Sequence, residues 1–326
     1  MILVTGGTGH VGNVLIRALL AKGERVRALV LPDDPCDSLA GLDVARVEGN
    51  VLDPASLRRA MVDVEVVYHL AGIISILPGR EALMQRVNVE GVGNVAQAAL
   101  ASGVRRMMHV SSIHAFRRAP HGVTVDETHP FATDRPAGSY DRTKAEGTLR
   151  VLAAVERGLD AVIVCPTGIL GPHDYLGSEI GQVVAGYARR RVHFLVDGAY
   201  DFVDVRDVAQ GLILACERGR TGEAYILTGT HVTLPEIKAL TQELVGVHSP
   251  HIIVPLALAK WAARFTELFY RLTHSTPQFT TYSLETVEDN AIFSCAKAET
   301  ALGYRARPLR ETLRDLLRWQ RAQAMA

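Results

Sequence analysis

The stretch Ile2-Leu3-Val4-Thr5-Gly6-Gly7-Thr8-Gly9-His10-Val11-Gly12 joins a short apolar run to a glycine-rich loop. Its branched apolar residues predict a buried strand, and the residues after Gly9 have the pattern of a helix. Gly6, Gly9 and Gly12 fall where strand turns into helix. A residue without Cβ lets the backbone approach a pyrophosphate, which the N–H groups and positive dipole end of the helix stabilise. The stretch therefore predicts a dinucleotide-binding loop.

Apolar runs and helical segments alternate from residue 1 to about residue 165. The runs predict strands at residues 2–4, 25–31, 44–47, 64–70, 106–110 and 161–165. Helices are predicted between them at residues 11–21, 54–61, 81–102 and 140–157. Strict alternation of this kind is typical of crossovers around a parallel sheet. We expect an α/β fold of the Rossmann type, with a doubly wound parallel sheet.

The alternation loosens after Pro166, where a Gly/Pro/His loop and an arginine run follow. Strand-like segments at 201–205 and 224–227 still look like parts of a sheet. We therefore expect residues 1–170 to form the dinucleotide-binding Rossmann domain, with segments around 201–248 returning to it. Residues 171–200 and 249–326 are expected to form a smaller, mostly C-terminal substrate-binding cap.

The composition excludes several classes of partner. The 326 residues hold 35 Lys and Arg against 35 Asp and Glu, so no positive field is available for a nucleic acid. The four cysteines are far apart without a C-x-x-C pair, which favours a reduced cytoplasmic compartment. No apolar run reaches the roughly 20 residues of a membrane span, and no His, Cys or carboxylate cluster has metal-site spacing, so neither is expected.

The end of the second predicted strand bears on the choice between NAD and NADP. An acidic residue there would bind a ribose 2′-hydroxyl, and an arginine would accept a 2′-phosphate. The chain has Val30 and Leu31 at these positions, followed by Asp33 and Asp34. Two carboxylates that fold back would repel a 2′-phosphate, so NAD is favoured over NADP. They can equally form a solvated turn.

Tyr140 and Lys144 are four residues apart at the start of a predicted helix and so share a face. Ser111 and Ser112 end the preceding strand, at the carboxyl edge where ligands of open α/β sheets bind. A phenol is a poor base at neutral pH, but a nearby ammonium lowers its pKa. These residues therefore predict an acid–base set for hydride transfer between an alcohol carbon and a nicotinamide.

Seven landmarks stand in order along most of the chain. They are the Gly6/Gly9/Gly12 loop, Tyr68-His69-Leu70-Ala71-Gly72, Asn88-Val89-Glu90-Gly91, His109-Val110-Ser111-Ser112, Tyr140 with Lys144, residues 165–172 and residues 201–209. With these motifs the sequence resembles the extended short-chain dehydrogenase/reductase family, the NAD(P)-dependent epimerase/dehydratase group.

The resemblance implies a role for each matching residue. Tyr140 would be the catalytic acid or base, Lys144 would also bind the nicotinamide ribose, and Ser112 would polarise the substrate, with Ser111 as the alternative. Asn88 is interpreted as a helix-stabilising residue. The resemblance also implies a homodimer that pairs the helices at 81–102 and 140–157. The dinucleotide would contact Gly6, Gly9, His10, Val11, Gly12, Leu31, Asn50, Val51, Leu70, Ala71, Gly72, Ser111, Tyr140, Lys144, Pro166 and Ile169.

Departures from the family pattern reduce the number of reactions that the chain is expected to catalyse. Sugar-nucleotide 4,6-dehydratases of this family have an acidic pair after the hydroxyl residue, where this chain has Ile113 and His114. Epimerases usually have an arginine before the Asp-Phe-Val segment to clamp a diphosphate, and here the residue is Tyr200. In the adenine pocket, Gly49-Asn50-Val51 replaces the common Gly-Asp-Leu, and the Asn amide can still meet the adenine.

The segment 252–272 carries aliphatic and aromatic residues at roughly helical spacing. It is interpreted either as a core-facing helix or as an apolar wall of a substrate pocket or partner-binding face. We expect an NAD(P)-dependent oxidoreductase acting on a hydrophobic secondary alcohol or ketone. One alternative is a nucleotide-sugar 4-epimerase with tightly bound NAD. The arginine run at residues 189–191 could bind a phosphate of its nucleotide-sugar substrate. A second is a non-catalytic dinucleotide sensor.

Overall fold

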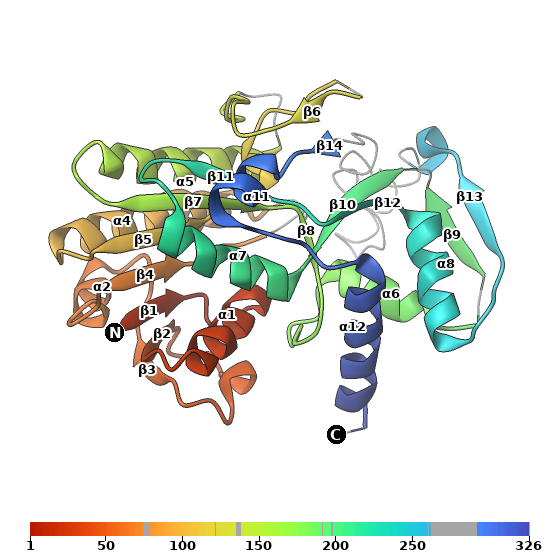
Figure 1. The fold of residues 1–326 in the computed structure, drawn as a ribbon, viewed down its shortest axis with the longest axis horizontal. Helices are drawn as coiled ribbons and strands as arrows, with labels where there is room; N and C mark the ends of the chain where they lie inside the picture. Colours follow the sequence, from red (N-terminus) through yellow and green to blue (C-terminus); the bar gives the residue numbers. More distant parts are fainter. Residues whose placement is uncertain are drawn as a thin grey trace.

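The computed structural model describes residues 1–74, 79–120, 122–134, 138–190, 192–196, 198–259, 261 and 292–325. Its centre is a seven-stranded sheet in the order β11-β7-β5-β4-β1-β2-β3 (Figure 1). Every neighbouring pair in this sheet is parallel. The strands are β1 (Ile2–Thr5), β2 (Val26–Val30), β3 (Ala45–Glu48), β4 (Val66–His69), β5 (Arg106–Val110), β7 (Ala161–Pro166) and β11 (Ala224–Leu227).

The order of the sheet confirms the predicted Rossmann-type fold. The chain runs outward from β1 to β3, returns to β4 beside β1, and continues to the opposite edge. This reversal between β1 and β4 is the topological switch point at which open α/β sheets bind their ligands. Each of the six strands predicted in the first half is present.

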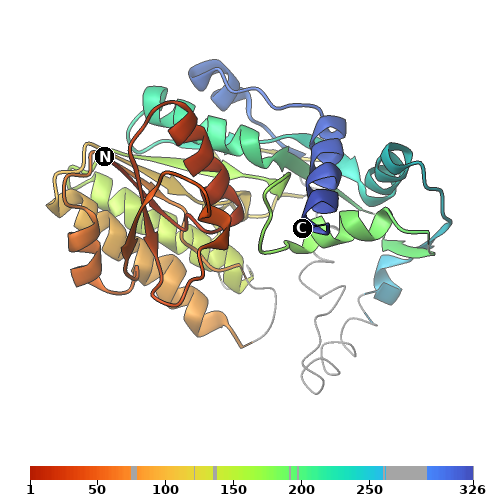
Figure 2. The same cartoon turned by 90° about the horizontal axis from the view of Figure 1, so that it is seen from below.

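Helices cover both faces of the sheet (Figure 2). One face carries α1 (His10–Ala21), α7 (Val205–Arg218) and α11 (Ala296–Leu302), which share one hydrophobic cluster with the strands. The other carries α2 (Pro54–Ala60), α4 (Val92–Ala101) and α5 (Ser139–Val155), which share a second cluster. Two buried clusters on opposite faces are what a doubly wound sheet requires.

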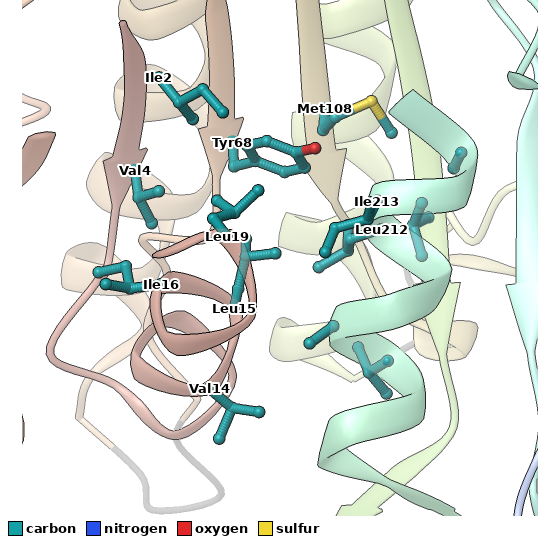
Figure 3. Packing of buried hydrophobic residues seen from close by; sticks show 14 of the residues in the cluster. Ile2, Val4, Val14, Leu15, Ile16, Leu19, Tyr68, Met108, Leu212 and Ile213 are labelled. Carbon is teal, nitrogen blue, oxygen red and sulfur yellow. The ribbon is translucent and has the colours of Figure 1, made fainter. Parts of the chain in front are cut away.

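The contact between α1 and α7 shows how the first face is filled. Leu15 and Leu19 of α1 and Leu212 of α7 lie with Tyr68 of β4 in one buried cluster (Figure 3). These side chains are nearly inaccessible to solvent. A buried aliphatic side chain of this kind contributes about 1.5–3 kcal/mol to folding. The packing fixes the start of α1, and with it the glycine-rich loop, against the sheet.

The predicted helix at 81–102 is present with one irregularity. It consists of α3 (Glu81–Gln85), a π-helical segment η2 (Arg86–Gly91) and α4. A π turn inside a helix inserts one residue and is frequent at functional sites. Here the turn contains Asn88, which contacts the loop after β4.

The remaining elements lie beyond the carboxyl edge of the sheet (Figure 1). A three-stranded sheet has the order β12-β10-β8, and β9 pairs with β13. The helices of this part share a third hydrophobic cluster. The elements are β8 (Gly168–Leu170), α6 (Glu179–Tyr187), β9 (His193–Val196), β10 (Ala199–Asp204), β12 (Thr230–Thr233), α8 (Leu234–Val245), β13 (His251–Val254) and α12 (Leu309–Gln323), with β6 (Thr124–Val125) pairing with β14 (Ile292–Phe293).

Two elements pack on the other side of the division expected from the sequence. Helix α8 lies within 201–248, yet its Ile237 packs with α6 and α12 in the third cluster. Helix α11 lies within 249–326, yet its Ala298 and Leu302 pack against α7 and β11. Packing partners far along the chain decide both cases, which is why the local sequence pattern did not place these helices.

The segment 252–272 does not begin as a helix. Ile252, Ile253 and Val254 form β13 with His251 and pair in parallel with β9. They are β-branched and precede Pro255, which disfavours helical backbone in the residue before it. Helical backbone follows Pro255, and the exposed Trp261 is also described, whereas residues 260 and 262–272 lie outside the described residues. Within the described ranges, no helix is long and apolar enough to cross a membrane.

Candidate active site

The loop between β1 and α1 lies against the loop that follows β4. Gly6 has a left-handed backbone (φ +70°), and a methyl group built on it would lie 2.7 Å from the Ala71 backbone nitrogen. A methyl group on Gly12 would collide with the Gly6 carbonyl oxygen, and one on Gly9 would lie 3.3 Å from it. The absence of side chains at these positions therefore forms a cradle of backbone atoms, which fits the predicted pyrophosphate.

The N-terminus of α1 opens into this cradle. Its N-cap residue, Gly9, has no side-chain capping hydrogen bond, so the first turn can offer N–H groups to an anion. The His10 side chain turns elsewhere, since its Nε2 lies 3.0 Å from the Pro172 carbonyl oxygen. Val11 is partly buried against the core. Contact of His10 and Val11 with a dinucleotide would therefore use their backbone.

The residues predicted on the adenosine side lie after β2 and β3. Leu31 is 53% exposed at the end of β2, and Val51 is buried. The Asn50 side-chain oxygen accepts a hydrogen bond from the Leu52 backbone N–H at 2.9 Å. This oxygen therefore stabilises a turn, a use that the sequence reasoning did not anticipate.

Asp34 folds back onto the glycine-rich loop. One of its carboxylate oxygens accepts a hydrogen bond from the Thr8 hydroxyl at 2.6 Å. The other accepts one from the Cys36 backbone N–H at 2.8 Å. The sequence left open whether this carboxylate folds back or lies in a solvated turn. Its position beside Thr8 brings a negative charge to the edge of the cradle.

Ser112 and Tyr140 meet at the carboxyl edge of the sheet. Ser112 is buried just beyond β5, and Tyr140 is half-buried in the first turn of α5. Their side chains are hydrogen-bonded to each other. Two adjacent hydroxyl groups in this position can hold one carbonyl oxygen between them. The structure thus brings together two of the three predicted catalytic residues.

Lys144, the third, lies one helical turn after Tyr140. Its Nζ donates a hydrogen bond to the Val110 carbonyl oxygen at 3.0 Å. A methyl group built on Gly72 would lie 3.9 Å from this Nζ. The ammonium group therefore faces the backbone of the loop after β4, where Leu70 and Ala71 precede Gly72 on the predicted dinucleotide surface.

Burial sets the protonation of Tyr140 and Lys144. It raises the pKa of Tyr140 to about 12, although the hydrogen bond with Ser112 acts to lower it. Burial lowers the pKa of Lys144 to about 8. The sequence predicted that Lys144 lowers the pKa of Tyr140. The expected net lowering is wrong, because the cost of desolvating the phenolate outweighs the influences that would lower the pKa of Tyr140. Tyr140 therefore keeps its proton at neutral pH.

The two serines of the pair differ in their contacts. The Ser111 hydroxyl lies 2.7 Å from the Thr148 hydroxyl of α5 and is buried. Ser112 instead contacts Tyr140 and accepts a hydrogen bond from the His114 backbone N–H at 3.2 Å. The geometry thus gives Ser111 a bond to the helix and Ser112 the position beside Tyr140.

Asn88 connects the cofactor loop to the catalytic helix. Its side-chain oxygen accepts a hydrogen bond from the Ile73 backbone N–H at 2.8 Å, and its amide donates to the Ile73 carbonyl oxygen at 2.9 Å. The same amide donates to the Thr143 hydroxyl of α5 at 3.2 Å. Asn88 therefore positions two parts of the site, beyond the helix-stabilising role expected for it.

The segment that follows β7 is held in place by a buried carboxylate. The Thr167 hydroxyl donates to an Asp201 carboxylate oxygen at 2.6 Å, and the Gly229 N–H donates to the same oxygen at 2.8 Å. Pro166 ends β7 and is buried, and Ile169 pairs with β10. This network fixes the backbone that the sequence predicts to face the nicotinamide.

The sequence named His114 and Tyr200 only as departures from the family pattern, and it did not predict that they lie around Tyr140 together with Asp141. The His114 ring stands edge-on to the Tyr140 ring, with centroids 5.8 Å apart, and its Nε2 lies 2.8 Å from the Tyr200 hydroxyl. Asp141 is 2% exposed beside them. Their places in the chain were the available signal, since His114 follows Ser112 by two residues and Asp141 follows Tyr140 directly.

The described residues do not meet the requirements of a metal site. Within those residues, no group of three or more His, Cys, Asp or Glu side chains could hold a metal ion. The buried histidines His69 and His109 stack on each other, with ring centroids 5.7 Å apart, under the Lys144 side of the site. Burial lowers the pKa of both imidazoles, so both are neutral.

A backbone cradle at the switch point, next to a serine, a tyrosine and a lysine, defines a class: nicotinamide-dependent oxidoreductases with a Rossmann fold. A sequence model described as the NAD dependent epimerase/dehydratase family matches residues 2–228. The chain belongs to this family and is an enzyme of the extended short-chain dehydrogenase/reductase type, as the resemblance implied. The prediction of a nicotinamide dinucleotide is confirmed at the level of the family.

Individual relatives match over nearly the whole chain. Sterol demethylase protein B of Methylococcus capsulatus is 36% identical over 327 aligned residues, which cover 99% of both proteins. A putative dihydroflavonol 4-reductase of Synechocystis is 30% identical and covers 97% of this chain and 93% of its own length. The crystal structure of gox2253 is 32% identical with a TM-score of 0.87, covering 99% of this chain and 98% of that one.

Proposed function

We propose that the chain is a reductase that transfers hydride from a nicotinamide to hydrophobic ketones, and the reverse from secondary alcohols. The observation that carries this proposal is the protonated Tyr140 hydroxyl, hydrogen-bonded to Ser112 at the sheet edge beside Lys144. A phenol with a pKa of about 12 is a proton donor at neutral pH. The names of two relatives, a sterol demethylase protein and a dihydroflavonol reductase, support a hydrophobic substrate.

The residues divide the work of the reaction. A bound nicotinamide supplies or accepts the hydride. Ser112 and Tyr140 hold the substrate oxygen, and the Tyr140 hydroxyl gives it a proton as negative charge develops there. The Lys144 ammonium stabilises the phenolate that remains. Asn88 and Gly72 keep the cofactor loop against Lys144, which preserves the alignment of the reacting groups.

We propose NAD rather than NADP as the dinucleotide. The support is Asp34, whose carboxylate bonds Thr8 at the edge of the cradle. A 2′-phosphate brought to this edge would meet that negative charge. Arginine is the side chain expected for a 2′-phosphate, and the end of β2 carries Val30 and Leu31 instead.

The enzymatic alternative is a nucleotide-sugar 4-epimerase with tightly bound NAD. Arg117 and Arg118 favour it, since both line a recess beside His114 and Tyr200 and could meet a phosphate. Each already has a carboxylate partner, however, because Arg117 pairs with Asp134 and Arg118 lies 3.5 Å from an Asp141 oxygen. Arg189 and Arg190 are exposed after α6, as a solvated helix end would be.

The third reading, a non-catalytic sensor, lacks support. Proteins of that kind usually lose the Tyr and Lys pair, which is intact here and hydrogen-bonded in place. Membership of an enzyme family points the same way.

Identification of the nucleotide that freshly purified protein releases on denaturation tests the proposal. A reductase exchanges its cosubstrate, so we expect an empty or partly filled site that binds NADH reversibly. Stoichiometric NAD that survives dialysis would instead favour the epimerase. Turnover of hydrophobic ketones with added NADH then separates the two, because an epimerase shows no net consumption of NADH.

We also propose a homodimer in a reducing, cytoplasmic compartment. The four cysteines are free, which agrees with such a compartment. Helices α4 and α5 pack against each other on one face of the sheet, and Leu149 of α5 is 40% exposed. A carboxylate there would oppose burial in an interface. We expect Leu149→Asp to shift the sedimentation coefficient from dimer to monomer, and a wild-type monomer would contradict the proposal.

A further inference from the structure

Three polar side chains from distant segments lie in contact, one after the other, beside the catalytic pair. An Asp141 carboxylate oxygen lies 3.4 Å from His114 Nδ1, and His114 Nε2 lies 2.8 Å from the Tyr200 hydroxyl oxygen. Asp141 belongs to α5, His114 to the 3-10 turn η3 (Ile113–Ala115), and Tyr200 to β10. We refer to them as the Asp141–His114–Tyr200 chain. Asp141 and His114 are 27 positions apart in the sequence, and His114 and Tyr200 are 86 positions apart, so only folding brings the three side chains together.

The direction of the hydrogen bonds follows from the buried end. Asp141 is 2% exposed and lies 3.5 Å from the Arg118 guanidinium, so its side chain is a carboxylate that only accepts hydrogen bonds. A carboxylate 3.4 Å from His114 Nδ1 favours the tautomer in which this nitrogen carries the hydrogen. In a neutral imidazole the other nitrogen then accepts. The Tyr200 hydroxyl accordingly donates its proton to His114 Nε2.

Tyr200 is left with a specific capacity. A phenol that has given its hydrogen to one partner can only accept a hydrogen bond from another. Among the described residues, the Tyr200 hydroxyl forms one hydrogen bond, the bond with His114. The Tyr200 hydroxyl oxygen can therefore accept a hydrogen bond from a further donor.

The position of Tyr200 is that of a substrate contact. Its ring packs over Gly168, where a methyl group would lie 2.7 Å from Tyr200 Cε1. Gly168 follows Pro166, in the backbone predicted to face the nicotinamide. Tyr200 also lines the recess described above, whose polar residues are His114, Asp141 and the carboxylate-paired Arg117 and Arg118, and whose apolar residues include Ile113, Phe116 and Phe293. This recess adjoins Ser112 and Tyr140 along the chain, and its mixed lining can contact both apolar and polar groups of a substrate.

Building on the proposed function, we infer that Tyr200 is a specificity-determining residue that accepts a hydrogen bond from a hydroxyl group of the substrate, apart from the carbonyl held by Ser112 and Tyr140. The substrate class is then a hydrophobic hydroxy ketone. A ketone with an ether or a second carbonyl in the same place offers no donor. It would leave the Tyr200 oxygen unpaired, and a buried unpaired polar group disfavours binding.

Three matched bicyclic ketones test the inference in the full-length protein with NADH. They are 2-hydroxy-1-tetralone, its methyl ether and the parent 1-tetralone. We expect wild-type kcat/KM for the hydroxy ketone to exceed that for the ether by about tenfold, the discrimination that one hydrogen bond provides. Tyr200→Phe should bring this ratio close to one. Tyr175→Phe, which removes an exposed hydroxyl elsewhere, should leave the ratio as it is in the wild type.

A second variant tests whether the Tyr200 hydroxyl donates its hydrogen to His114. With His114→Leu the Tyr200 proton loses its acceptor, so the hydroxyl can donate to the ether oxygen. The ratio should then shift in favour of the ether, an outcome that a purely structural role for His114 does not produce. Retained binding of NADH by each variant shows that it is folded.

The outcomes separate the inference from the proposed function. A wild type that reduces the ketones without preferring the hydroxy compound overturns the inference alone, as does an unchanged ratio in Tyr200→Phe. If the wild type reduces none of the three ketones, the proposed function is contradicted, and the inference is contradicted with it.

Discussion

The dinucleotide side and the substrate side of the active site are built in different ways. The dinucleotide side consists of backbone, since Gly6, Gly12 and Gly72 leave room where any side chain would intrude. The substrate side consists of side chains that fold together from distant segments, such as His114 and Tyr200. The dinucleotide side binds a ligand of one shape, and a local sequence motif predicts it. The second can change with single residues, so it is where specificity is decided.

Removal of one oxygen from the catalytic centre should have the largest effect. Tyr140→Phe keeps the ring but removes the proton donor, so turnover should fall by about 10²-fold or more. NADH affinity should stay close to that of the wild type, because the cradle is untouched. Steady-state kinetics and NADH titration measure the two quantities. Unchanged turnover would refute the role given to Tyr140.

A methyl group in the cradle should damage the dinucleotide side. In Gly12→Ala the new Cβ meets the Gly6 carbonyl oxygen, and overpacking of this kind costs about 1–3 kcal/mol. We expect NADH affinity to fall by about tenfold to a hundredfold. Gly93→Ala in α4 is the matched control, since its nearest neighbour is a flexible Arg150 side chain at 3.9 Å. Equal affinities for the two variants would show that the loop is not a close-fitting cradle.

The pH dependence should report the link between the two sides. The pKa of Lys144 is lowered from 10.5 to about 8, so its ammonium loses the proton as the pH rises through about 8. Reduction depends on this charge and should decline several-fold above that pH. Lys144→Arg keeps its charge, so its remaining activity should decline only at higher pH. Profiles of kcat/KM against pH with identical midpoints would contradict this use of Lys144.

A single carboxylate should account for a smaller effect, the preference for NAD. Asp34→Asn removes the charge beside Thr8, and two charges a few ångströms apart in a water-like environment interact by about 1 kcal/mol. The ratio of the NADP and NAD dissociation constants should fall by about fivefold. Asp33→Asn changes the neighbouring carboxylate, which forms no hydrogen bond with the loop in the described part of the chain, and should alter the ratio less. An unchanged ratio in Asp34→Asn would remove the argument for NAD.

The same contrast explains what the sequence could predict. The strands, the sheet class and the cradle follow from local patterns, because apolar runs and glycine spacing act over a few residues. Ser112 was identified because it follows the carboxyl end of a predicted strand, and Tyr140 and Lys144 because they lie four residues apart at the start of a predicted helix. The structure then showed that Ser112, rather than Ser111, contacts Tyr140.

Other features depend on tertiary structure and were not predictable. The Asp141–His114–Tyr200 chain joins three segments with no common motif. The raised pKa of Tyr140 results from burial, which no single stretch of sequence reveals. The strand β13 depends on its pairing with β9, and helix α8 on its packing with α6 and α12. In each case the deciding partner lies far away along the chain.

The transfer of deuterium most directly tests the central claim that this enzyme reduces a ketone with hydride from NADH. The protein would be incubated with NADH deuterated at both C4 positions and a hydrophobic ketone, and the alcohol product analysed by mass spectrometry. We predict one deuterium at the carbinol carbon of each product molecule, with one NADH consumed for each alcohol formed. An unlabelled alcohol, or no NADH consumption by protein that retains stoichiometric NAD, would contradict the claim.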